Sequence, residues 1–260
     1  MKQEIKQEKS IWIFLCYAFA IPLICIIAMQ NQLFTDNRII VFILYGIEGA
    51  SPAIAAILVA AHKGGIAGAL HFLRNKYVKA FKIKYILIGF IMPAFLLTLT
   101  KLITYLTPYN NQFLTIPSEK KIVIIFWALI AEELGWRGYL QDSIEERIGR
   151  KFTPLMVGGI WAAWHYHFFV SGSMEVPIFA FIYGCIVESY GYYLITKAAK
   201  GNIVPASVWH FSGNLFFNLY LLNPNWNGGS TVPYNISNLI MTVYIIAFIW
   251  KKKNTNLKGV

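Results

Sequence analysis

Apolar runs long enough to cross a membrane recur along this 260-residue chain. A transmembrane helix needs about 20 predominantly apolar residues. Only 13% of the residues are charged, against about 25% in an ordinary soluble domain. We therefore predict an all-α, polytopic membrane helix bundle with about eight transmembrane helices. The predicted spans are 11–29, 39–61, 83–106, 121–140, 154–171, 175–198, 203–222 and 234–251. No repeat or soluble domain interrupts them, so residues 1–260 are treated as a single domain.

The basic residues, which give the chain a net charge of +11, lie at the ends of the apolar runs rather than in one patch. With both termini inside, the inner segments hold 19 lysines and arginines and the outer segments hold three. An excess of this kind marks the cytoplasmic side. The sequence thus predicts a multi-pass protein of the cell membrane, in contact with membrane lipids, with both termini cytoplasmic. The scattered charge argues against nucleic acid as a partner.

Two glutamates and an arginine follow the apolar run 122–130. A charge at the centre of a membrane helix costs about 2.5–3.5 kcal/mol on insertion scales, so three together need a compensating use. Residues four apart share a helix face, so Glu133 can pair with Arg137. Glu132 then projects elsewhere and is free to face a cavity. We expect a structural pair beside a glutamate that transfers protons; the alternative is that both glutamates only neutralise the arginine.

Two later spans carry histidines at helical spacing. Trp161 and His165 share one face of the fifth predicted span, and His210 and Asn214 share one face of the seventh. At 1.5 Å per residue, Glu132, His165 and Asn214 lie roughly 15–16 Å into their spans, and His210 about 10 Å. Four polar side chains from three spans should therefore meet near the midplane. The alternative is a set of independent polar clamps between helices.

Three further ionisable residues lie inside predicted spans. His167 is about 200° round the helix from His165, so the two cannot easily serve one site. It is expected to be a packed, hydrogen-bonded residue. Glu48 and Glu188 match no motif, and structural hydrogen bonding is the role expected for them.

The pattern Glu132-Glu133…Arg137, Trp161…His165 and His210…Asn214 resembles the CPBP family. That family comprises the CAAX prenyl proteases of the Ras-converting-enzyme type and the bacteriocin-processing or Abi-type intramembrane proteases. The motifs occupy residues 132–214 of this chain. One departure is Trp161, where the family usually has phenylalanine. We interpret this position as packing rather than chemistry.

The resemblance implies a bacterial-type intramembrane endopeptidase that hydrolyses a peptide bond of a membrane-associated or lipidated peptide or protein. By the same resemblance, Glu132 would be the general base on a water, helped by His165. His210 and Asn214 would donate to the oxyanion. Glu133 and Arg137 would support the site.

Other interpretations remain open. A zinc site could be built from His165, His210 and Glu132, but no HExxH motif is present, so a mechanism without a metal or other cofactor is favoured. A protein of the same fold could also act without catalysis, as a membrane immunity or peptide-binding and regulatory protein. A proton-coupled transporter is disfavoured because the chain has no inverted repeats.

Overall fold

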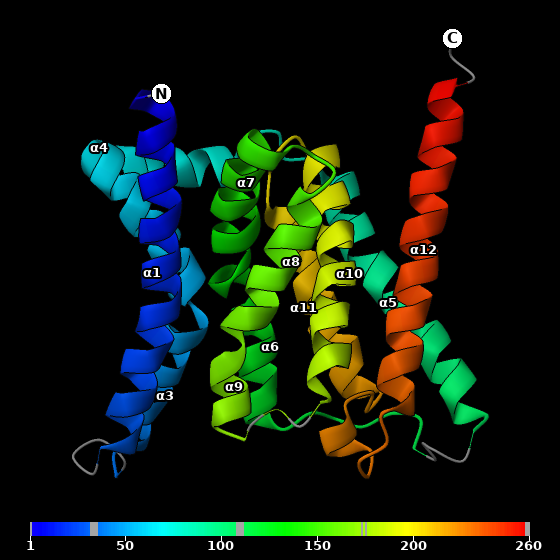
Figure 1. Cartoon of the computed structure of the whole chain (residues 1–260). Coiled ribbons are helices and arrows are strands. Elements are labelled where there is room, and N and C mark those ends of the chain that lie inside the picture. The colour runs from blue at the N-terminus through cyan, green and yellow to red at the C-terminus, as the bar shows by residue number, and fades with distance from the viewer. Residues whose placement is uncertain (1, 32–35, 108–111, 173, 175, 258–260) are drawn as a thin grey trace.

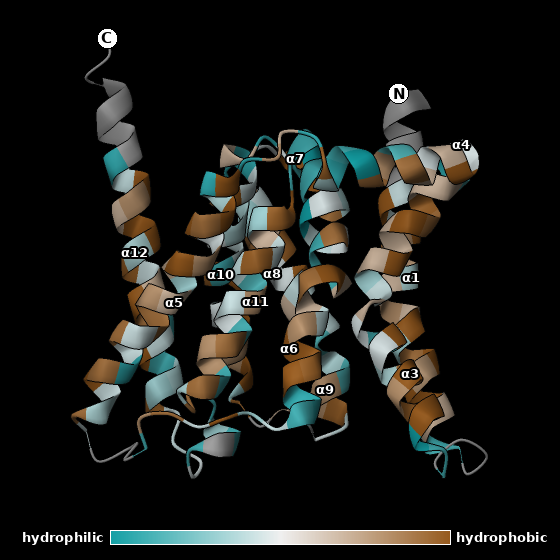
Figure 2. Ribbon diagram, turned by 180° about the vertical axis from the view of Figure 1, so that it is seen from behind, coloured by the Kyte–Doolittle hydropathy of each residue, from teal (hydrophilic) through white to brown (hydrophobic). Residues whose placement is uncertain are grey.

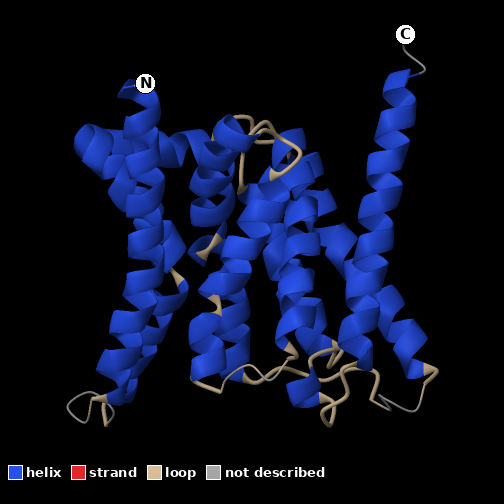
Figure 3. Cartoon of the chain, viewed as in Figure 1, coloured by secondary structure: helices blue, strands red, loops and turns tan. Residues whose placement is uncertain are grey.

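The computed structural model describes residues 2–31, 36–107, 112–172, 174 and 176–257. Helices are the regular elements throughout these residues, and Figure 3 shows no strand among them. The predicted all-α class is confirmed. Both ends of the predicted domain 1–260, and residue 175 at the start of the sixth predicted span, lie outside the described residues.

Helices occupy each of the eight predicted spans. Their bounds are α1 Lys2–Gln30, α3 Arg38–Gly49, α4 Ser51–Tyr77, α5 Ile83–Tyr105, α6 Glu119–Ala131, η1 Leu134–Leu140, α7 Gln141–Ile148, α8 Thr153–Trp164, α9 Tyr166–Val170, α10 Ile178–Ala198, α11 Val204–Leu219, η2 Pro224–Trp226 and α12 Val232–Leu257. In the described part of the chain, five stretches are long and apolar enough to cross a membrane: Ser10–Gln30, Ser51–Tyr77, Ile83–Tyr105, Ile178–Ala198 and Val232–Lys251. Of these, Ser51–Tyr77 is kinked at Gly64 and Gly65. The protein is a multi-pass membrane protein, and the count of eight spans stays a prediction.

Three predicted spans are interrupted rather than continuous. The second divides at Ala50, between α3 and α4. The fourth divides after Ala131, where α6 ends before the π-helix η1, and the fifth at His165, between α8 and α9. Continuous helices were the wrong expectation here, because hydropathy reports the length of an apolar run and not where its hydrogen-bond ladder breaks. Such breaks are tolerated at membrane depth when they are buried in protein.

The helices stand side by side in one bundle (Figure 1). α1 with α3 and α4 forms one edge, α12 forms the other, and α6, α8, α10 and α11 lie between them. Brown, hydrophobic residues cover much of these helices, and teal ones gather around α7 (Figure 2). The start of α1 and the end of α12 lie at the same end of the bundle, as an even number of membrane crossings requires.

Two glycines allow the helices around the centre to approach closely. A Cβ on Gly158 of α8 would lie 2.7 Å from Ile186 Cα and 3.0 Å from the Cys185 carbonyl oxygen of α10. A Cβ on Gly135 of η1 would collide with Pro52 at the start of α4. Small residues at such contacts let helix backbones pack tightly inside membranes. These contacts fix α8 on α10 and η1 on α4.

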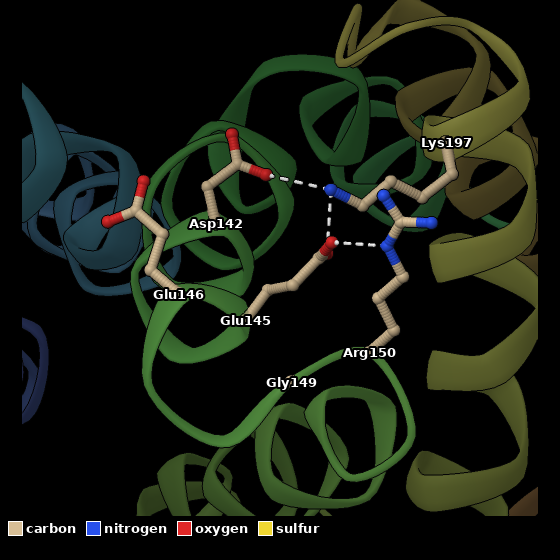
Figure 4. A pocket seen from close by; sticks show the side chains of 6 residues that line it. All are labelled: Asp142, Glu145, Glu146, Gly149, Arg150 and Lys197. Carbon is tan, nitrogen blue, oxygen red and sulfur yellow. Dashed lines mark hydrogen bonds and ion pairs between the residues drawn. The ribbon is translucent and has the colours of Figure 1, made fainter.

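An ion-pair cluster fastens α7, which continues η1, to its neighbours. Lys197 of α10 reaches between Asp142 and Glu145 of α7, at 3.4 and 2.6 Å (Figure 4). Lys76 of α4 bonds Asp142 at 2.6 Å, and Arg150 bonds Glu145 at 3.3 Å. The cluster borders a cavity of about 480 Å³. None of the predicted site residues lines this cavity, so it is separate from the predicted chemistry.

Candidate active site

The two glutamates lie at the interruption of the fourth predicted span. α6 ends at Ala131, and the π-helix η1 begins at Leu134 with all seven of its residues buried. The backbone oxygen of Glu132 accepts from the N–H groups of Gly135 and Trp136, at 2.9 and 3.1 Å. Short π-helical stretches often occur at functional sites. Here the wider turn brings the side chains of both glutamates towards α8 and α11.

Glu133 and Arg137 form the expected ion pair. Arg137 Nη1 donates to Glu133 Oε1 at 3.1 Å, and both side chains are fully buried. Arg137 Nη2 donates to Ser189 Oγ of α10, also at 3.1 Å. The guanidinium carbon lies 4.5 Å from the ring centre of Trp161 and 4.0 Å from that of Tyr192. Arginine is therefore held by hydrogen bonds at its tip and by two aromatic rings.

Glu133 has a second partner that its sequence position did not reveal. His210 Nδ1 lies 2.9 Å from the same Oε1 atom that Arg137 contacts. An ionised carboxylate only accepts, so His210 Nδ1 carries the proton of this hydrogen bond. The opposite nitrogen, Nε2, then faces Glu132, with Nε2 3.9 Å from Glu132 Oε1. Glu133 thus orients the imidazole towards the neighbouring carboxylate, in addition to pairing with Arg137.

Trp161 is the centre of the cluster. Its indole N–H donates to Glu132 Oε2 at 2.8 Å, and the indole of Trp136 donates to the same atom at 3.3 Å. The rings of His165 and His210 lie 5.4 and 5.9 Å from the Trp161 ring. The interpretation of Trp161 as packing alone was wrong, because its N–H is bonded to the carboxylate.

His165 occupies the break between α8 and α9. Its Nδ1 lies 2.8 Å from the backbone oxygen of Trp161, which is one turn earlier and would bond the backbone N–H of this residue in an unbroken helix. The ring packs edge-on against Trp164 and Phe181, both at 4.9 Å between ring centres. His165 therefore joins the cluster through Trp161, without a direct hydrogen bond to Glu132 in the described part of the chain.

Asn214 lies one turn beyond His210 on α11 and is half-buried. Its carboxamide forms no hydrogen bond with the described residues, although its backbone oxygen accepts from Asn218 at 2.8 Å. The structure thus joins Glu132, Glu133, Arg137 and His210 in one polar network and brings His165 beside it. Asn214 shares α11 with His210, but its carboxamide takes no part in this network of described residues.

α10 contributes residues that sequence reasoning missed. Ser189 bonds Arg137, and Tyr192 stacks on it. Tyr192 also hydrogen-bonds Glu188, so the structural hydrogen bonding expected of that glutamate is present. One signal could have been used: Glu188, Ser189 and Tyr192 are polar or semi-polar groups within one turn of an otherwise apolar span.

A second buried pair lies behind His165. His167 Nε2 of α9 is 3.3 Å from Glu48 Oε1 of α3, and both residues are buried. His167 Nδ1 is also 2.7 Å from the Trp164 backbone oxygen. His167 is thus the packed, hydrogen-bonded residue that was expected, and Glu48 has a structural partner.

The zinc alternative requires three ligands around one point. Among the residues that the structure describes, no three histidine, cysteine, aspartate or glutamate side chains are arranged to hold a metal ion. His210 Nδ1 and His165 Nδ1 are already bonded within the protein. Histidines that bind a metal through Nε2 commonly have Nδ1 bonded in this way, so these two hydrogen bonds do not argue against zinc, and the metal-free mechanism stays a prediction.

The central segment of the chain is similar to known proteins. Residues 120–216 match the family model described as type II CAAX prenyl endopeptidase Rce1-like. The central segment of the chain is therefore similar to this family. This match agrees with the resemblance to the CPBP family, and it covers every predicted site residue. A CAAX prenyl protease 2 from Methanococcus maripaludis is 37% identical to the chain over 62 residues, which are 22% of this chain and 23% of that protein. The match spans only about a quarter of that relative's length.

Proposed function

We propose that the protein is an intramembrane endopeptidase that uses Glu132 to activate a water molecule. The observation that carries this proposal is the separation of 3.9 Å between Glu132 Oε1 and His210 Nε2. Two hydrogen bonds of about 2.8 Å each can span such a gap through one bent water bridge. The site therefore offers a base and a facing imidazole on either side of a water position.

In this mechanism the water gives its proton to Glu132 Oε1 as its oxygen attacks the carbonyl carbon of the scissile peptide bond. His210, with protons on both nitrogens, donates from Nδ1 to Glu133 and from Nε2 to the oxyanion. Asn214 supplies a second donor from the same face of α11. Glu132 then returns the proton to the leaving nitrogen, and the peptide bond breaks into a carboxylic acid and an amine.

The supporting residues keep this arrangement in place. Arg137 compensates the charge of Glu133, and Glu133 sets the orientation of His210. His165 lies beside Trp161 and helps to orient the water bound by Glu132. Buried charges that are prearranged in this way act strongly because little reorganisation is needed during the reaction.

The substrate class follows from the membrane setting and from the relatives. A peptide bond reaches this site only from a membrane-associated or lipidated peptide or protein, because the site lies within the bundle. The name of the Methanococcus relative makes a prenylated peptide the first substrate to test. The cell membrane, with both termini cytoplasmic, is the proposed location, supported by the distribution of lysines and arginines.

The test uses purified protein in lipid vesicles with a farnesylated peptide, and cleavage is followed by mass spectrometry. Glu132→Gln keeps the shape of the side chain and removes the base, so the rate should fall by about 10²–10⁴-fold. Glu119→Gln is the matched control, because this exposed glutamate begins α6, the helix that ends just before Glu132, and lies outside the cluster. A chelator should leave the rate of the unchanged protein as it is.

Three results would overturn all or part of this proposal. Cleavage by Glu132→Gln at the rate of the unchanged protein would remove Glu132 from the chemistry. Tight binding of a panel of lipidated and unmodified membrane peptides with no cleavage by the unchanged protein would instead favour a peptide-binding membrane protein. Loss of activity with the chelator, restored by zinc, would replace the metal-free mechanism.

A further inference from the structure

The carboxylate of Glu132 is held asymmetrically. Oε2 accepts from two indole N–H groups, that of Trp161 at 2.8 Å and that of Trp136 at 3.3 Å. Oε1 faces His210 Nε2 across 3.9 Å. The carboxylate side chain is 14% exposed, more than that of Glu133 or His210. One oxygen is therefore occupied by the protein while the other remains available.

We propose that Trp161 and Trp136 are positioning residues that clamp Glu132 by Oε2 and leave Oε1 as the oxygen that receives the proton. This inference rests on the proposed function. It adds which carboxylate oxygen of Glu132 accepts the proton and which residues orient that oxygen. The two indoles come from different elements: Trp161 from α8, and Trp136 from η1, one turn after Glu132. The clamp therefore joins two parts of the fold at the reacting group.

The indole is suited to this position for a physical reason. It is a donor only, so it cannot accept the proton that Glu132 removes from water. It is also rigid and largely apolar, which keeps the surroundings of the carboxylate dry while still stabilising its charge. A hydroxyl or an imidazole at the same place would compete for the proton. Two indoles thus orient the base without taking part in proton transfer.

Packing alone does not explain this arrangement. Trp164, three residues after Trp161, is also buried, and its N–H donates to the Ala18 backbone oxygen and Ser51 Oγ, both at 3.0 Å. That indole ties α8 to α1 and α4 and does not bond Glu132. The same helix therefore carries one tryptophan that joins helices and one that holds the candidate base. This pair supplies a matched comparison.

Trp161→Phe keeps an aromatic ring and removes the N–H. A donor to the carboxylate stabilises its charged form, so without it a higher pH is needed before the base is ionised. We expect kcat to fall by about 10- to 100-fold at pH 6–7, in line with the loss of a hydrogen bond to a charged group. The loss should shrink as pH rises, because the acid limb of the rate profile moves to higher pH. KM should change by less than about twofold.

The groups around Glu132 stay the same in this variant. Glu133 and Arg137 come from the same segment, His210 from α11, and Cys185, Glu188 and Tyr192 from α10; His165 lies beside Trp161. A displaced acid limb would therefore report the missing indole donor. Trp136→Phe removes the longer bond and should give a smaller change in the same direction.

Trp164→Phe is the control for lost aromatic volume and a lost buried hydrogen bond. It should lower the melting temperature while leaving the acid limb where it is in the unchanged protein. If Trp161→Phe and Trp164→Phe lower kcat equally at every pH, Trp161 only packs and the clamp is refuted. An unchanged profile in both Trp161→Phe and Trp136→Phe would also refute it. The cleavage assay of Glu132→Gln tests the proposed function separately. The clamp can therefore be refuted while the proposed function is retained.

Discussion

Replacing Arg137 by methionine tests the buried charge network most directly. Methionine has nearly the length of the arginine stem but no charge, so Glu133 keeps its position and loses its counter-ion. Both side chains of the pair are completely buried, at 3.1 Å. Removing one partner of a buried ion pair costs about 3–5 kcal/mol, because the remaining charge loses its compensation; here Glu133 loses the guanidinium and keeps His210 as its partner. The loss of the contacts to Ser189, Trp161 and Tyr192 adds to this.

The expected size of the effect can be measured by thermal unfolding in detergent micelles. At about 2–4 °C per kcal/mol for a chain of this size, Tm falls by about 6–20 °C. Arg150→Met is the control, since Arg150 also pairs with a glutamate, at 3.3 Å, but its side chain is 87% exposed. An exposed pair contributes about 0–1 kcal/mol, so this control should shift Tm by no more than about 4 °C.

A double variant separates charge from packing. Glu133→Gln combined with Arg137→Met removes the uncompensated charge and keeps an oxygen that can accept from His210. Its Tm should therefore lie above that of Arg137→Met alone, and the coupling between the two sites is read from the double-mutant cycle. The argument fails if Arg137→Met melts within about 2 °C of the unchanged protein. It also fails if adding Glu133→Gln to Arg137→Met lowers Tm by as much as Glu133→Gln does in the otherwise unchanged protein.

Two further predictions concern the surroundings of the site. Gly158→Ala should destabilise the protein by about 1–3 kcal/mol through overpacking against α10. Gly159→Ala is the control, because its Cβ would meet nothing within 4 Å, and it should be neutral or slightly stabilising. Equal melting temperatures of the two variants would contradict the close α8–α10 contact. Glu48→Leu should cost about 1–3 kcal/mol because it removes the polar group that faces His167 Nε2 inside the protein. Glu48→Gln should cost clearly less, since an amide still places a polar group beside that nitrogen, 3.3 Å away in the unchanged protein. Tm measurements that rank the two variants in the opposite order would refute the pair.

The helical class and the positions of the helices could be predicted because the apolar runs report directly on membrane burial. The breaks could not. Nothing in the apolar run 122–130 indicates that α6 ends at Ala131 and that a π-helix follows. The same holds for His165, where the polar side chain bonds a backbone oxygen that an unbroken helix would use for itself. Such local changes depend on neighbouring helices, which a single run of residues does not reveal.

The sequence predicted which residues belong to the site better than it predicted the hydrogen bonds between them. Spacing along one helix predicted the Glu133–Arg137 pair, because both ends of that contact lie in one segment. The contact of Glu133 with His210 crosses 77 positions and depends on how α11 rotates against η1. The roles of Trp161 and Ser189 were missed for the same reason, since each bonds a residue on another helix. Asn214 was included by spacing, and the structure leaves its carboxamide without a hydrogen bond to the described residues.

The two interruptions have a common consequence for the chemistry. Glu132 lies at the break after α6, and His165 lies at the break between α8 and α9; Trp161 contacts both, through its N–H and its ring. A side chain at a helix break takes its direction from tertiary partners rather than from the helical ladder. The distance from Glu132 to His210 is therefore set by the packing of α8 and α11 against η1. For this reason, substitutions that loosen α8 on α10, such as Gly158→Ala, should lower catalytic activity at temperatures well below those at which they unfold the protein.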